Sequence, residues 1–148
     1  MTMSYPKWSE LPDIDLYLDQ VLLYVNQIGE ANHQNEKGLT ASMINNYVKH
    51  GHLRKSRLRK KYSRKQVARL IVITSLKNVF SIQEISQTLA ILTADNQSQK
   101  RYDDFVACMN GEKIDDLPPV VVSACQTLQL YYQTHQLVQE LEGEKDEC

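Results

Sequence analysis

The chain has 148 residues, of which 42% are hydrophobic and 24% charged, the usage of an ordinary globular protein. It has no run near the roughly 18 apolar residues of a membrane span and no N-terminal signal-peptide pattern, so we expect a cytoplasmic protein. Three cysteines without a CxxC spacing argue against a disulfide framework.

Charge is segregated along the chain, although the formal net charge is only −1. Residues 1–36 carry one basic and six acidic side chains, and residues 84–148 carry four basic and twelve acidic ones. Between them, residues 37–83 carry twelve Lys and Arg and no Asp or Glu. Crowding like charges costs self-repulsion, which a polyanionic partner relieves. The middle region therefore predicts binding to a polyanion such as nucleic acid.

The first helix is expected over residues 14–28. Asp13 is suited to be its N-cap, Gly29 is expected to end it, and residues 30–38 form a polar loop. Its apolar residues recur at helical spacing, at Ile14, Leu18, Val21, Leu22, Val25 and Ile28.

A second, short helix is expected over residues 41–50, capped by Thr40 and stopped by Gly51. Its apolar stripe consists of Met43, Ile44, Tyr47 and Val48. This stripe leaves four polar side chains on the outer face, those of Ser42, Asn45, Asn46 and Lys49. Residues 53–62 then predict a tight basic hairpin or an extended loop.

Two Ser-x-x-Gln/Glu capping boxes, starting at Ser63 and Ser81, open the third and fourth helices. The third is apolar around most of its circumference, which predicts a central, widely buried helix despite its β-branched residues 71–74. A fifth helix is expected over residues 99–110.

The last helix is expected over residues 119–142, with Pro119 in its first turn. One apolar stripe runs along Val121, Cys125, Leu128, Tyr132 and His135, beside another of Ala124, Leu128, Tyr131, His135 and Val138. So wide an apolar surface suggests a homodimer contact. We therefore expect a DNA-binding domain over residues 1–93 and a C-terminal helical extension over residues 94–148, which is the candidate dimerisation region.

This order of elements is that of a winged helix-turn-helix unit, and residues 43–89 resemble the DNA-binding region of the MerR regulator family. That family has a recognition helix ending in Tyr-x-x-x-Gly-x-Leu, a basic wing ending in Arg-x-Tyr-Ser, and a later Phe-Ser-x-x-Glu-Ile. The matching residues are Tyr47, Gly51, Leu53, Tyr62, Ser63, Leu70, Ile73, Leu76, Phe80, Ser81, Glu84 and Ile85. The chain departs from the pattern at Asn45 and Lys60, where the family usually has arginine. The resemblance implies a mainly all-α fold: a MerR-like winged helix-turn-helix with a short β-hairpin wing and additional C-terminal helices.

Nearly the whole chain also resembles an uncharacterised bacterial family, domain of unknown function 1836. The similar segments are PDIDLYLDQV near the start, MINNYVK in the second expected helix, and KKYSR before the third. This resemblance implies a bacterial protein and brings no activity with it.

The candidate DNA-contacting residues lie in the second helix and in the basic segment that follows it. Asparagine is suited to bidentate pairing with adenine, whereas Lys and Arg contact phosphates without reading sequence. The candidates are Thr40, Ser42, Asn45, Asn46, Tyr47, Lys49, Arg54, Lys55, Arg57, Arg59, Lys60, Lys61, Tyr62, Arg64 and Lys65. The sequence thus predicts a transcriptional regulator that binds double-stranded DNA, as a homodimer; it indicates no effector.

Two other interpretations stay open. The basic face would also suit an acidic partner protein, with the winged fold as a scaffold. RNA fits less well, because no RNA-module motif occurs and Tyr62 is the one aromatic residue close to the wing. No enzyme, cofactor or metal is expected: catalytic motifs are missing, and no Cys or carboxylate lies in the thirty residues after His50 and His52.

Overall fold

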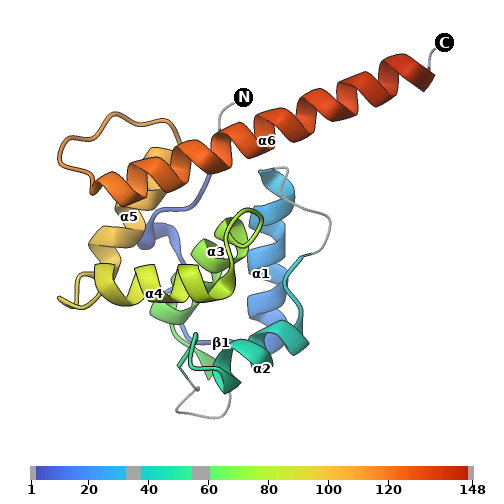
Figure 1. Ribbon diagram of the computed structural model, residues 1–148. Helices are drawn as coiled ribbons and strands as arrows, with labels where there is room; N and C mark the ends of the chain where they lie inside the picture. Colours follow the sequence, from blue (N-terminus) through green and yellow to red (C-terminus); the bar gives the residue numbers. More distant parts are fainter. Residues whose placement is uncertain (1–2, 33–37, 55–60, 147–148) are drawn as a thin grey trace.

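The computed structural model describes residues 3–32, 38–54 and 61–146, with side chains up to residue 143. Helices pack around a central α3, and a small two-stranded antiparallel sheet joins them (Figure 1). The expected mainly helical fold is confirmed. In chain order the elements are η1 (Trp8–Glu10), β1 (Leu16–Tyr17), α1 (Leu18–Ala31), α2 (Ala41–Lys49), β2 (Lys61–Tyr62), α3 (Arg64–Leu76), α4 (Ile82–Leu92), α5 (Ser98–Met109) and α6 (Pro119–Asp146).

The helix α3 lies at the centre, as its composition predicts. Its capping box is confirmed, since the Gln66 amide donates to Ser63 Oγ at 3.4 Å and the Ser63 amide donates to Gln66 Oε1 at 2.8 Å. Residues 70–76 are all buried, and α3 contacts α1, α4, α5, α6 and β2. Packing on every side therefore outweighs the weak helix propensity of its β-branched residues.

The helix α1 begins four residues later than expected and continues past Gly29 to Ala31. Asp13 does not cap it, because Asp13 Oδ1 accepts from Arg64 Nη2 at 2.8 Å and the Pro12 carbonyl accepts from Arg64 Nε at 3.4 Å. These contacts hold the segment before α1, which bends at Asp13 and Ile14, against the start of α3.

The small sheet joins two segments that lie far apart in the sequence, which the sequence did not predict. Leu16 pairs with Tyr62 and Tyr17 with Lys61, so within the described residues the strand partner of β2 lies far away in the sequence. Leu16 and Tyr62 are both buried, so this pairing is part of the hydrophobic core. Residues 55–60 lie outside the described part of the chain.

The helices α4, α5 and α6 complete the fold. The second capping box is confirmed, with the Glu84 amide donating to Ser81 Oγ at 3.1 Å. Along α6, four members of the first predicted stripe are buried, and Asn78 Nδ2 donates to the Tyr132 hydroxyl at 3.2 Å. His135, the fifth member, is exposed, because α6 projects beyond the body of the protein toward its C-terminus (Figure 1).

Candidate nucleic-acid interface

The helix α2 presents the polar face that the sequence predicts. Thr40 Oγ1 accepts from the Met43 amide at 3.2 Å, which confirms the N-cap. Ile44 and Tyr47 are buried. The outer side chains are exposed, and they are those of Ser42, Asn45, Asn46 and Lys49. Asn45 and Asn46 are therefore available to a partner.

The entry to α2 is fixed by α1. Asn26 Nδ2 donates to the Leu39 carbonyl at 3.0 Å, and the Leu39 amide donates to Asn26 Oδ1 at 2.7 Å. The Asn26 side chain thus forms two hydrogen bonds with the Leu39 backbone, as a neighbouring β-strand would. Gly38 permits this close approach, because a Cβ at that position would collide with the Asn26 amide group.

The exit from α2 is fixed as well. Gly51 has φ +77°, the left-handed conformation that glycine adopts without strain at a helix end. The Tyr47 carbonyl then accepts from the amides of His52 at 2.8 Å and Leu53 at 3.2 Å.

Two side chains of α3 hold the backbone that leaves α2. Arg69 Nε donates to the His52 carbonyl at 2.7 Å, and Gln66 Nε2 donates to the Arg54 carbonyl at 2.9 Å. The central helix therefore sets the position from which the basic segment begins.

Most described cations of this region lack an acidic neighbour. Lys49, Arg54 and Lys65 are exposed and form no ion pair within the described residues. Arg64 differs, since it pairs with Asp13 at 2.8 Å. Lys61 Nζ lies over the Tyr17 ring, 5.0 Å from its centroid. The candidates Lys55, Arg57, Arg59 and Lys60 lie outside the described residues.

Comparison with protein families identifies the group to which these features belong. The model of the family described as Domain of unknown function (DUF1836) matches residues 6–105. The chain belongs to the DUF1836 family. The match covers α2, β2, α3 and α4 and ends within α5, so α6 lies beyond the matched DUF1836 region. No curated protein and no solved structure matched the chain.

The two candidate tyrosines of the DUF1836 region are packing residues. Tyr47 is 8% exposed and Tyr62 is 7% exposed, and both belong to the hydrophobic core. Burial raises the pKa of both phenols, so they stay neutral at physiological pH. Their effect on an interface is therefore to position α2 and β2.

The list of candidates drawn from the sequence leaves out two cations of the same acid-free region. Arg69 is half-buried, and burial, followed by repulsion from Arg54, lowers the pKa of its guanidinium. Burial likewise lowers the pKa of Lys77, whose Nζ lies 3.5 Å from Met43 Sδ on α2. Both residues lie in the acid-free stretch, which is the sequence feature that could have indicated them. They were missed because the residues around them in and just after α3 are mostly apolar.

Within the described residues, no group of three His, Cys, Asp or Glu side chains is close enough to hold a metal ion. None of the described helices has the length and hydropathy needed to cross a membrane.

Proposed function

We propose that this chain is a sequence-specific DNA-binding protein and a transcriptional regulator, built as a MerR-like winged helix-turn-helix. In this proposal α2 is the recognition helix, and the basic segment of residues 53–62 is the wing. The observation that carries it is the exposed Ser42, Asn45, Asn46 and Lys49 face of a helix fixed at both ends.

The polar face of α2 has the chemistry of base recognition. A helix fits the major groove of B-DNA, where asparagine forms a bidentate pair with adenine and serine bonds to either base type. Asn45 and Asn46 occupy consecutive exposed positions, with Ser42 about one turn earlier. A recognition helix must also keep its orientation, and the contacts of Asn26 and Arg69 supply that support.

The surrounding cations have the chemistry of phosphate binding. Lys49 and Arg54 lie at the end of α2 and just after it, Lys65 lies in the first turn of α3, and all three are exposed. Since no described carboxylate neutralises them, their charge is available to DNA phosphates.

Substitution of Asn45 by alanine tests the recognition role of α2. Duplexes selected from a random library are expected to bind the Asn45→Ala variant about tenfold or more weakly, because a bidentate base contact is lost. Unselected duplex DNA should bind both proteins equally, since phosphate contacts are unchanged. Fluorescence anisotropy at low salt measures both affinities.

A matched control is Gln126→Ala, because Gln126 is an exposed amide on α6 outside the proposed interface. It should bind every duplex as the native chain does. The proposal is overturned if the native chain fails to bind any duplex at low salt, and binding of an acidic protein instead would support the scaffold alternative. An equal loss for selected and unselected DNA would remove α2 from base recognition.

We further propose that the regulator is a homodimer formed through the projecting part of α6. Leu130, Leu137 and Leu141 are 62%, 51% and 64% exposed. At 3.6 residues per turn they share one side of the helix, about half a turn away from the buried Val121 and Leu128. A second copy would cover this stripe, and a two-fold dimer suits a palindromic operator.

The dimer is tested by placing a charge in this stripe. Leu137→Glu is expected to convert a dimer into a monomer, because two carboxylates would face each other across the apolar contact. Light scattering after gel filtration gives the mass. Gln139→Glu is the control, since Gln139 lies about half a turn from the stripe and the dimer should persist. A native chain that is monomeric at high concentration would contradict the dimer.

A further inference from the structure

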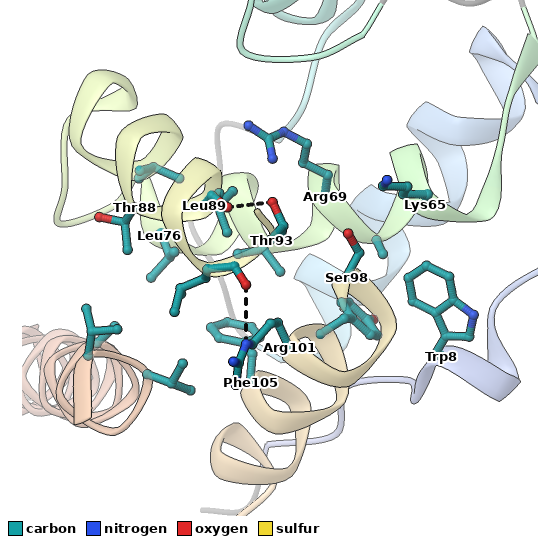
Figure 2. A pocket seen from close by; sticks show the side chains of 18 residues that line it. Trp8, Lys65, Arg69, Leu76, Thr88, Leu89, Thr93, Ser98, Arg101 and Phe105 are labelled. Carbon is teal, nitrogen blue, oxygen red and sulfur yellow. Dashed lines mark hydrogen bonds between the residues drawn. The ribbon is translucent and has the colours of Figure 1, made fainter. Parts of the chain in front are cut away.

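An apolar cavity lies between α3, α4, α5 and the first turns of α6, with Trp8 at its edge (Figure 2). Its volume is about 120 Å³. Most of its wall is hydrocarbon, contributed in part by Val72, Leu89, Leu92 and Phe105. A closed cavity of about 150 Å³ admits benzene. This one is somewhat smaller but opens to solvent on one side, so it suits a branched alkyl group or a compact ring whose polar end projects from the opening.

One side of the cavity is polar. Figure 2 shows the polar ends of Lys65, Arg69, Thr93 and Ser98 on one side, with Leu76 and Phe105 away from them. Neither Lys65 nor Arg69 has an ion pair within the described part of the chain. The cavity therefore combines an apolar interior with a cationic rim.

The third cation of the lining is already neutralised. Arg101 lies 3.8 Å from the carboxylate of Asp95 and 3.6 Å from that of Asp104, and its Nε donates to the Leu92 carbonyl at 3.3 Å. The uncompensated positive charge is thus confined to the Lys65 and Arg69 side.

The hydrogen bonding and burial of Arg69 indicate that an anion would bind favourably at the rim. Its single described hydrogen bond, from Nε to the His52 carbonyl, uses one of five N–H donors. Burial and Arg54 both disfavour its charge. An anion at the rim would offset both effects and accept hydrogen bonds from the remaining donors.

We propose that this cavity binds a small amphipathic monoanion: a carboxylate on a compact aryl or branched alkyl body of about the size of benzoate. The apolar body lies among Val72, Leu89 and Phe105, and the carboxylate faces Lys65 and Arg69. Ligand binding at this site goes beyond the proposed DNA binding. The experiments measure it in the absence of DNA, so either proposal can fail while the other holds.

Three probes of nearly equal size test the charge of the site: benzoate, benzyl alcohol and benzylammonium. Trp8 is the one tryptophan of the chain and lines the cavity, so its fluorescence reports binding. We expect saturable benzoate binding, at least about tenfold tighter than that of benzylammonium, with the alcohol between them. Equal affinities for benzoate and benzylammonium, or no saturable response to benzoate at millimolar concentrations, would overturn the proposal.

Two variants locate the binding. Ala124→Leu places a larger side chain in the cavity wall and should abolish the benzoate response, while its circular dichroism stays native. Lys65→Gln changes an exposed side chain, leaves the core intact and should weaken benzoate but not benzyl alcohol. Lys113→Gln, in the exposed loop before α6, is the matched control and should change neither. Unchanged benzoate binding in Ala124→Leu or Lys65→Gln places the ligand elsewhere and rejects this site.

Discussion

The affinity for duplex DNA is expected to fall about a thousandfold when the salt concentration rises from about 50 to about 200 mM. Each phosphate contact made by Lys or Arg releases a condensed counterion, so the logarithm of the binding constant falls with the logarithm of salt at a slope near −0.9 per contact. About six contacts produce this loss. Lys49, Arg54 and Lys65 are exposed and available for them, and the sequence has four further cations in residues 55–60.

Anisotropy titrations across a salt series measure this slope. Arg54→Gln should reduce its magnitude by about one, because one phosphate contact is removed. Lys113→Gln should leave it unchanged, since Lys113 lies in the acidic loop before α6. A slope near zero for the native chain would rule out phosphate contacts as the source of affinity.

Replacement of Leu70 by alanine is expected to reduce the free energy of unfolding by about 3 kcal/mol. Leu70 has 0% exposure at the middle of α3, which other helices surround. The substitution removes buried apolar surface and leaves a space that neighbours on every side cannot close. A loss of this size is a large part of the roughly 5–15 kcal/mol that stabilises an ordinary domain.

Urea denaturation followed by circular dichroism measures this change. The control is Leu23→Ala on α1, where the leucine is 63% exposed and the expected change is within about 0.5 kcal/mol. Equal effects of the two substitutions would show that α3 is not the centre of the core.

Local signals were sufficient for most of the helices and for the face of α2. Ser63 and Ser81 each begin a helix because their hydroxyls and the side chain three residues later satisfy free amides within one turn. The exposure of Asn45 and Asn46 likewise follows from Ile44 and Tyr47 at helical spacing. These interactions involve residues only a few positions apart.

Contacts between distant residues explain where the predictions were wrong. Nothing near Asp13 indicates that Arg64 will bind it, so α1 was expected too early. The pairing of Leu16 with Tyr62 has the same origin, because register between separated strands depends on the whole fold. The sequence did not indicate Arg69 as a candidate, because its hydrogen bond to the His52 carbonyl depends on how α3 packs against the segment that follows α2. Similarly, the periodicity of α6 does not show that the body ends near Tyr132 and leaves His135 exposed.

The paired hydrogen bonds between Asn26 and Leu39 make the geometry of α1 and α2 independent of the chain that joins them. Asn26 of α1 binds the backbone of Leu39 just before α2, and the absence of a side chain at Gly38 allows this close approach. Insertions or deletions within residues 33–37 therefore need not alter the angle at which α2 is presented, since loop length affects closure entropy only slowly.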